Sequence, residues 1–299
     1  MEKKSQIDLF GAVALTSFAL LLAFNQVVIK VTNGGLQPVF FAGLRSLGAV
    51  VCIWLWLRWR GIPLRFEKGT RAAGFAVGCV FAFEFLCLFV ALDLTAVSRA
   101  SVIFYSMPVW LAIMAHFIMP NDKITPKKAL GLGLALAGVA VAILTRDDGV
   151  GSFWGDLAAL GAAVGWAVTA MIAKASSLSR VRPEIQLMWQ VGVSAPLLLF
   201  AALFFGPFIR DIAPIHIAGL AFQIVVVVSA GFIFWLWLLS IYPASGVASF
   251  SFLSPVLAVA LGWLLLGEQV GPNLIAALIL VAIGILLVNR PSRSRKTSV

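Results

Sequence analysis

Long apolar stretches separated by short polar segments run through nearly the whole 299-residue chain. Each stretch holds roughly 20 residues, enough for a helix to cross the hydrocarbon layer of a bilayer. A membrane β-barrel would instead show strand-length segments of alternating polarity. The pattern predicts an all-α membrane protein with ten transmembrane helices, at residues 8–30, 37–58, 71–92, 97–119, 127–145, 153–175, 184–207, 215–240, 246–266 and 271–289.

The second half of the chain repeats features of the first. The stretch SRASVIFYSMPVWLAIMAHFIMPND, residues 98–122, has a counterpart in SGVASFSFLSPVLAVALGWLLLGE, residues 245–268, with serine, aromatic and proline positions in common. Further corresponding pairs are Lys30 and Lys174, Pro38 and Pro183, Arg45 and Gln190, and Gly138 and Gly284. Because each half holds five spans, the second half would be inverted in the membrane. We predict two inverted five-helix repeats, at residues 1–148 and 149–299.

Composition supports the membrane assignment, because 62% of the residues are hydrophobic and only 11% are charged. The net charge of +10 would also suit a nucleic-acid-binding protein, but most basic residues gather in alternate loops. Lys30, Arg99, Arg146 and Arg210 lie on the opposite side, and Arg45 lies within a span. This positive-inside pattern predicts cytoplasmic termini and basic groups against anionic lipid headgroups, with no nucleic-acid partner.

Arg45 and Glu84 are the basic and acidic residues placed well inside predicted spans. An isolated charge at that depth is costly, so such groups are paired or lie in a hydrated cavity. One interpretation is a structural ion pair between the second and third spans. The other is that Glu84 lines a pathway and meets a substrate amine or a coupling proton. Both can hold at once.

The fourth and ninth spans present matching polar faces. Ser101 and Tyr105 share one helical face, and Ser249 and Phe252 occupy the corresponding positions of the copy. A single serine in a membrane helix often bonds to its own backbone or to a neighbouring helix. The repeated stripe favours a shared cavity wall.

Two prolines and a stripe of small residues indicate which helices bend and which pack closely. Pro108 and Pro255 interrupt the hydrogen-bond ladder of their helices, so we expect kinks that act in gating. The fifth span carries a stripe of small residues suited to close helix contact: Gly131, Ala135, Gly138 and Ala142.

The remaining candidate cavity residues are Asn25, Trp166, Thr169, Trp189 and Gln190. Most tryptophans of membrane proteins belong to interface belts. Trp166 and Trp189 lie deeper, so a cavity role and an interface role both stay open. An aromatic wall would bind apolar or aromatic side chains, or cations over the ring faces.

Motifs of other protein classes are missing from the sequence. Cys52, Cys79 and Cys87 are odd in number and lie in apolar spans, so we expect packing roles. His116 and His216 have no partner at metal-ligand spacing. The chain holds no HExxH, nucleophile elbow, phosphate-cradling loop or dinucleotide motif. We therefore expect neither an enzyme nor a bound metal or cofactor.

Several motifs together resemble the drug/metabolite transporter superfamily, in its EamA-type ten-helix branch. They are the Asn25 span that ends in Lys30, the Pro38 and Arg45 span, the Pro108 span followed by Asp122, and the glycine-rich fifth span. An acidic residue follows the fourth span and its copy in this family, and Asp122 and Glu268 match. Leu22 and Ala23 replace the usual Trp-Gly of the first span, whereas Trp166 is kept in the copy.

The resemblance covers nearly the whole chain and implies a secondary transporter of the bacterial inner membrane. It is closest to exporters of aromatic and other neutral amino acids with broad specificity. The family implies a central cavity lined by spans one, three, four, six, eight and nine, with spans five and ten as scaffold. We expect a monomer that moves its small-molecule substrate by alternating access.

Other functions remain as alternatives to amino-acid export. A multidrug exporter of aromatic cations would also use one intramembrane glutamate and several aromatic residues. A phosphorylated substrate is disfavoured, because the spans of the second half hold no central Lys or Arg to meet phosphate. A channel is a further alternative, although the sequence lacks rings of charge or a carbonyl-filter motif.

Overall fold

The computed structural model describes residues 7–119, 123–145, 151–242, 250 and 252–289. Within these ranges the regular structure is helical, apart from an isolated β-bridge between Leu36 and Ile209. The described ranges hold nine helical segments that are long and apolar enough to cross a membrane, together with one shorter apolar helix. The predicted all-α membrane protein is confirmed.

The helices follow the predicted spans closely. They are α1 (Leu9–Asn33), α2 (Pro38–Trp59), α3 (Arg71–Leu94), α4 (Val97–Phe104), α5 (Met107–Ile118), α6 (Pro126–Leu144), α7 (Phe153–Ala175), α8 (Pro183–Ala201), α9 (Pro214–Phe222), the π-helical η4 (Gln223–Gly231), α10 (Phe232–Ile241), α12 (Leu253–Leu266) and α13 (Pro272–Asn289). Short 3-10 helices are η1 (Lys68–Thr70), η2 (Ser177–Arg180) and η3 (Ala202–Phe204).

Prolines set the start of five of these helices. Pro38, Pro126, Pro183, Pro214 and Pro272 each occupy the first helical position. That position has no partner for a backbone N–H, so the missing donor of proline costs nothing there, and its fixed φ suits the helix. The loops before them are short, which keeps successive helices adjacent.

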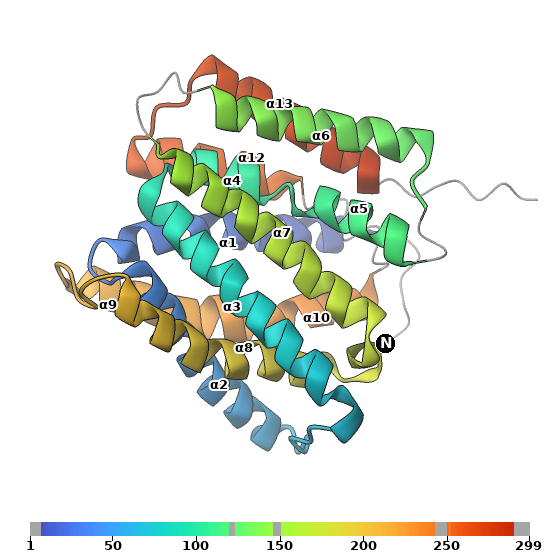
Figure 1. The fold of residues 1–299 in the computed structure, drawn as a ribbon, viewed down its shortest axis with the longest axis vertical. Helices are drawn as coiled ribbons and strands as arrows, with labels where there is room; N and C mark the ends of the chain where they lie inside the picture. The colour runs from blue at the N-terminus through green and yellow to red at the C-terminus, as the bar shows by residue number, and fades with distance from the viewer. Residues whose placement is uncertain (1–6, 120–122, 146–150, 243–249, 251, 290–299) are drawn as a thin grey trace, which may run out of the picture.

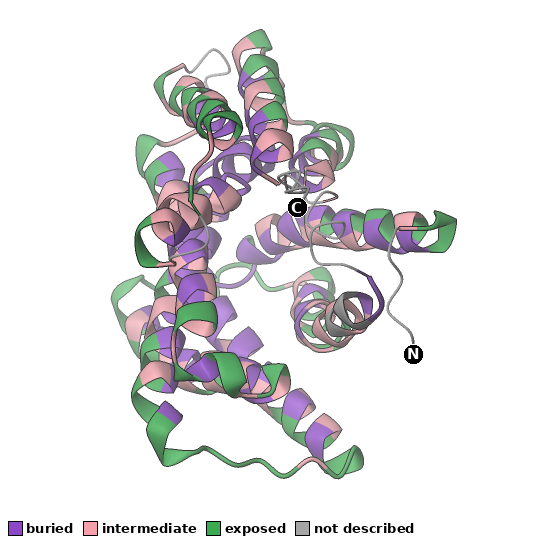
Figure 2. Ribbon diagram, turned by 90° about the vertical axis from the view of Figure 1, so that its right-hand side faces the viewer, coloured by how far each residue is buried: buried purple, intermediate pink, exposed green. Residues whose placement is uncertain are grey.

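The helices form a bundle in which α6 and α13 lie side by side along one edge (Figure 1). In the rest of the bundle α3 packs on α7 and α8, α2 packs on α8, and α1 packs on α12. Each of these contacts joins a helix of residues 1–148 to a helix of residues 149–299, so the halves interlock. Buried residues line the helix faces that meet one another (Figure 2), and large apolar side chains cover much of the outside.

Glycines hold α6 against α13. A Cβ added at Gly131 would lie 2.8 Å from the carbonyl oxygen of Gly284, and a Cβ at Gly284 would lie 2.6 Å from the Cβ of Ala135. A Cβ at Gly138 would similarly lie 2.8 Å from the carbonyl oxygen of Ala277. Backbones approach this closely only where the facing residues are small. The contact predicted from the small-residue stripe is confirmed.

The fourth span is interrupted at its proline. The helix α4 ends at Phe104, and α5 begins at Met107 with Pro108 in its first turn. Proline has no N–H and clashes with the turn before it, so the regular hydrogen-bond ladder stops here. Tyr105 and Ser106 keep near-helical dihedral angles, and α4 and α5 together form one span, Val97–Ile118, with the interruption where the sequence predicts a kink. Pro255 lies in the first turn of α12, where proline is tolerated. Residues 243–249 lie outside the described ranges, so a kink there stays a prediction.

Candidate functional site

Glu84 lies on the face of α3 that packs against α7. The residue is 1% exposed, and its Oε2 accepts a hydrogen bond of 3.2 Å from the Thr169 hydroxyl. A Cβ added at Gly165, one turn earlier on α7, would lie 3.1 Å from the Cβ of Glu84. The glycine therefore admits this close approach. The single bond from Thr169 leaves most of the acceptor capacity of the carboxylate unused.

Arg45 does not form the predicted ion pair with Glu84. No described carboxylate lies within salt-bridge distance of its guanidinium, and its Nε has no hydrogen-bond partner although the residue is 4% exposed. The guanidinium instead lies 3.8 Å from the ring centroid of Phe85 and 5.5 Å from that of Phe89. Both rings belong to α3, as does Glu84, so the cation–π contact replaces the expected direct pair.

A row of buried polar groups runs along α4. Ser98 and Ser101 are fully buried, and their hydroxyl oxygens have no hydrogen-bond partner. Tyr105 follows at the end of α4, 3% exposed, with its side chain beside those of Gln26 and Ser254. The Oε1 of Gln26 also lacks a partner. Unsatisfied buried polar atoms are rare in proteins, so their gathering between α1, α4 and α12 marks a special region.

Asn25 lies next to this row on α1 and is 7% exposed. Its Oδ1 accepts a hydrogen bond from Nε2 of Gln223. Gln223 begins the π-helical segment η4, and its Oε1 is buried without a partner. π-Helical turns often occur at functional sites, because the extra residue re-aims the side chains around it.

The predicted aromatic residues divide between two hydrophobic clusters. Tyr105 is part of the larger one, and Trp166 and Phe252 pack against it. Trp189 packs against the smaller one, and its ring centroid lies 4.5 Å from that of Phe66. Phe85 touches both clusters. Tyr105, Trp166 and Phe252 thus contact one extended cluster, whereas Trp189 contacts another.

The half-buried Gln190 lies beside Trp189 on α8. A Cβ added at Gly74 of α3 would lie 2.4 Å from the indole ring of Trp189, which shows how closely this ring packs on α3. The indole Nε1 has no hydrogen-bond partner. Ser249 lies outside the described residues, so its place in the cavity wall stays a prediction.

Glu268 joins α12 to the start of α4. Its Oε1 accepts a hydrogen bond of 2.6 Å from the Val97 N–H, and its Oε2 accepts one of 2.8 Å from the Ser98 N–H. The positive φ of Gly267, 65°, turns the chain back after α12 and brings Glu268 to this position. A carboxylate at a helix N-terminus satisfies orphan N–H groups and complements the helix dipole.

Other ionic contacts gather at the same end of the bundle, which we call the Lys30 end. Arg210 donates to both oxygens of Asp93, at 2.7 and 2.9 Å, and to the carbonyl oxygen of Asn33 at 3.0 Å. This bonding raises the pKa of the Arg210 guanidinium above its ordinary value. Lys30 donates to the carbonyl oxygens of Asp93 and Thr95, at 3.2 and 3.0 Å.

A buried ion pair ties α4 to α7. The Nε of Arg99 lies 2.9 Å from the Asp156 carboxylate, and the exposed fractions of the two side chains are 4% and 0%. Arg99 also donates to the carbonyl oxygen of Thr145 at 2.9 Å. Together with Glu268, these contacts fix the beginning of α4 to both halves of the chain.

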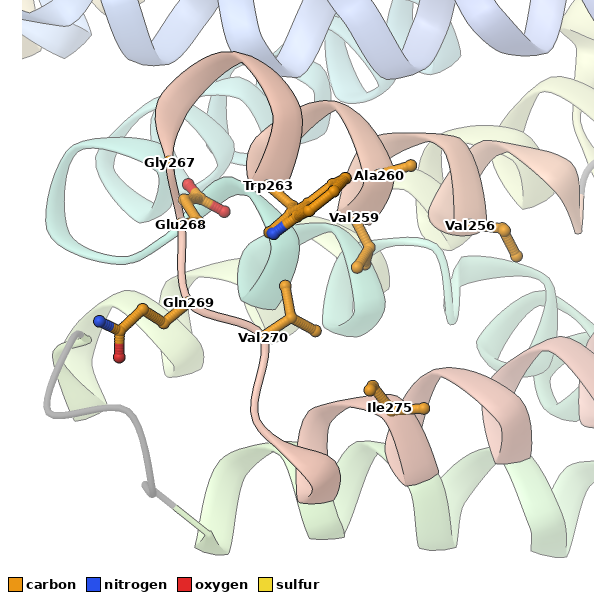
Figure 3. Close-up of a pocket in the computed structure, with 9 residues that line it drawn as sticks. All are labelled: Val256, Val259, Ala260, Trp263, Gly267, Glu268, Gln269, Val270 and Ile275. Atoms are coloured by element: carbon orange, nitrogen blue, oxygen red, sulfur yellow. The ribbon is translucent and has the colours of Figure 1, made fainter.

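A groove separates α12 from α13, and Figure 3 shows its lining. Its volume is about 650 Å³, and Val256, Val259, Trp263 and Ile275 supply apolar walls, with Glu268 at one end. Trp263 is 60% exposed. The helix α12 is therefore loosely packed on the side facing α13, in contrast to the close contact between α6 and α13.

A second pocket, of about 320 Å³, lies between the loop before α3 and the loop before α8. Arg65, Arg180 and Arg182 line it together with Glu67. The sequence places these residues on the basic side of the membrane, where we expect contact with anionic lipid headgroups.

The histidines make local hydrogen bonds, and the cysteines are unpaired. His116 Nδ1 accepts a hydrogen bond of 3.2 Å from the Ile124 N–H, and His216 Nδ1 accepts one of 3.0 Å from the Ala213 N–H. Cys52, Cys79 and Cys87 are free thiols. Within the described part of the chain, no His, Cys, Asp and Glu residues cluster in a way that could hold a metal ion.

Some residues of this region were not among the sequence-based candidates. Gln26 neighbours the candidate Asn25, but on a helix it points to a different face, and only the structure shows that this face also turns inward. Gln223 and Ser254 are polar residues within apolar stretches, and this polarity is the sequence signal that could have identified them. Asp156 lies near the start of a span, and nothing in the sequence indicates its buried ion pair with Arg99.

A bundle of membrane-spanning helices with polar groups buried among them, and ionic contacts at one end, has the architecture of a membrane transporter. The sequence profile of the EamA-like transporter family matches residues 9–144 and 153–290. The chain belongs to this family, which is part of the drug/metabolite transporter superfamily.

The chain is similar to two uncharacterized transporters of Bacillus subtilis (strain 168). YvbV is 29% identical over 298 residues, which cover 95% of each chain. YoaV is 25% identical over 281 residues, covering 91% of this chain and 94% of the relative. A protein of Salmonella typhimurium named as a probable amino-acid metabolite efflux pump is 26% identical over 284 residues, covering 92% of this chain and 93% of the relative.

A solved crystal structure has a similar fold. It aligns with a TM-score of 0.66 at 20% sequence identity, over 92% of this chain and 95% of that chain. At this level of identity the similarity supports the fold alone.

Proposed function

We propose that this transporter exports aromatic and other neutral amino acids across the bacterial inner membrane by alternating access. The observation that carries the proposal is a set of buried polar atoms without hydrogen-bond partners: Oε1 of Gln26, the hydroxyl oxygens of Ser98 and Ser101, and Nε of Arg45. In a membrane such groups are costly unless a substrate or water meets them during the working cycle. They lie inside the bundle and not on its lipid-facing side.

Two features favour amino acids among possible small molecules. Tyr105, Trp166 and Phe252, which contact the same hydrophobic cluster, would supply an aromatic wall beside polar side chains, as expected for a ligand that is apolar at one end and charged at the other. The relative from Salmonella typhimurium carries the name of a probable amino-acid metabolite efflux pump. Asn25 and Thr169 would bind polar atoms of the substrate, as would Gln190 and Ser249.

In many transporters, alternating access moves two related halves of the chain against each other. The contact between α6 and α13 supports such a relation between the halves here. Gly131 corresponds in the repeat to Ala277, and Gly138 to Gly284. Gly131 contacts Gly284, and Gly138 contacts Ala277. Such reciprocal contacts are expected around a two-fold axis between the halves. The two segments matched by the family profile support the same division, at residues 1–148 and 149–299.

The contacts at the Lys30 end would form the gate of this transporter. Glu268 and Arg210 come from the second half, and they bind α4 and Asp93 of the first half. The positive-inside pattern assigns this end to the outside, so the structure would represent a state closed to the outside. The α12–α13 groove leaves α12 room to move, while the α6–α13 pair would act as scaffold.

Counterflow with purified protein in liposomes tests the proposal. Liposomes loaded with unlabelled L-phenylalanine should accumulate labelled L-phenylalanine, with saturation, and a panel of neutral amino acids should compete. Exchange of lipophilic aromatic cations without exchange of any amino acid would overturn amino-acid export in favour of a multidrug exporter. Conductance without saturation would instead indicate a channel.

A further inference from the structure

The buried charges Arg45 and Glu84 lie at similar depths in neighbouring helices. Arg45 is seven residues from the start of α2, and Glu84 is ten residues from the end of α3, at the same end of the bundle. At the helical rise these positions are about 10 and 15 Å inside the span. The two charges interact through space, but they do not touch.

Both groups keep unused hydrogen-bonding capacity. The contact with Phe85 occupies the flat face of the Arg45 guanidinium, whereas its N–H groups point outward in the plane. The buried Nε of Arg45 has no hydrogen-bond partner. On the other side, Glu84 receives one hydrogen bond, from Thr169. A direct ion pair would have satisfied both groups and left nothing for a ligand.

We infer that Arg45 is the receptor for the substrate carboxylate and that Glu84 receives the substrate amine, so that the site selects α-amino acids as zwitterions. This inference rests on the proposed function. A guanidinium binds a carboxylate through two parallel N–H donors, and a carboxylate binds an ammonium group through charge-assisted hydrogen bonds. Two opposite charges that are near but not in contact match a ligand whose own charges are adjacent and opposite.

The position of Arg45 also fits the rest of the substrate. Phe85, beneath the guanidinium, touches both hydrophobic clusters, including the one with Tyr105, Trp166 and Phe252. An amino acid held at its charged end by Arg45 and Glu84 could therefore place its side chain against this aromatic wall. A lipophilic cation without a carboxylate would leave Arg45 buried and unpaired, which is unfavourable.

Competition by substrate analogues tests the inference. Exchange of labelled L-phenylalanine is measured with unlabelled L-phenylalanine, L-phenylalaninamide, which lacks the carboxylate, or 3-phenylpropionate, which lacks the amine. In the wild-type protein we expect phenylalanine to compete roughly 10-fold to 100-fold better than either analogue, the range for one charged hydrogen-bonding partner. In Arg45→Gln the preference over the amide should disappear while the preference over 3-phenylpropionate remains.

Glu84→Gln should give the opposite result, losing only the preference over 3-phenylpropionate. Glu67→Gln, the same change at an exposed position, is the matched control and should keep both preferences. Loss of either preference in Glu67→Gln as well would show that the preferences do not depend on the buried charges and would overturn the inference. An unchanged preference in Arg45→Gln would do the same.

The wild-type protein provides a test that needs no variant to fold. Equal competition by phenylalanine, its amide and 3-phenylpropionate would overturn the inference and leave the proposed function standing. The lack of exchange for phenylalanine and every other amino acid would overturn the proposed function itself.

Discussion

Glu268 offers the sharpest test of the gate. Its carboxylate accepts two hydrogen bonds from the first N–H groups of α4, at 2.6 and 2.8 Å. A hydrogen bond to a charged group contributes about 1.5–3 kcal/mol when buried. Glu268→Gln keeps one acceptor oxygen and loses the charge, and Glu268 is partly accessible to solvent. We therefore expect the closed state to lose about 1–2 kcal/mol, a factor of roughly 5–30 in the ratio of closed to open protein.

The assay measures access to α4 from the Lys30 end. A cysteine is placed at Ser101, which is fully buried, in a background where Cys52, Cys79 and Cys87 are replaced by serine. A membrane-impermeant maleimide added at the outer face should label it faster in Glu268→Gln, by up to the same factor. Glu67→Gln, the same change at the opposite end, is the control and should leave the rate unaltered. Equal labelling rates in the Glu268→Gln variant and in the protein that keeps Glu268 would refute the role of Glu268 in closure.

Three further predictions concern packing and the Lys30 end. Gly284→Leu should separate α6 from α13 and lower the melting temperature by roughly 5 °C, because overpacking costs about 1–3 kcal/mol. Gly133→Leu is the control: a Cβ at Gly133 would have nothing within 4 Å, so the melting temperature should not change. Equal effects of the two changes would contradict the close contact. Gly165→Ala should slow amino-acid exchange, because the added methyl group would displace α3, whereas Gly192→Ala has open space and should not. The initial exchange rates of the two variants test this, and equal rates would contradict it. Arg210→Lys keeps the charge but loses the bidentate contact with Asp93. Labelling of the cysteine at position 101 from the outer face should therefore become a few times faster, and an unchanged rate would count against this contact as part of the gate.

The positions of the helices could be predicted well from the sequence, because their signals are local. Spans of about 20 apolar residues have few alternatives in a membrane, and prolines at helix starts mark the boundaries. The small-residue stripe also indicates a contact before the partner is known. Pro108 illustrates the limit of such reasoning. Its disruption of the helix was predictable, but whether the result is a kink or a break depends on the surrounding packing.

The candidate site was harder to predict, because it depends on the relative rotation of helices. The sequence suggests an ion pair between Arg45 and Glu84 from charge and depth, whereas the structure places Arg45 against the ring of Phe85. Trp189 was grouped with Trp166, but they lie against different clusters. No local signal distinguishes an aromatic residue that faces one cluster from one that faces the other.

The most direct test of the central claim is the rate of amino-acid exchange by Glu84→Gln. The account holds that the buried carboxylate of Glu84 lies on the substrate path, so replacing it should leave expression and folding intact and reduce exchange of labelled L-phenylalanine in liposomes to a lower but measurable rate. Glu67→Gln, at an exposed position, should exchange like the wild type. Undiminished exchange by a correctly folded Glu84→Gln protein would contradict the account.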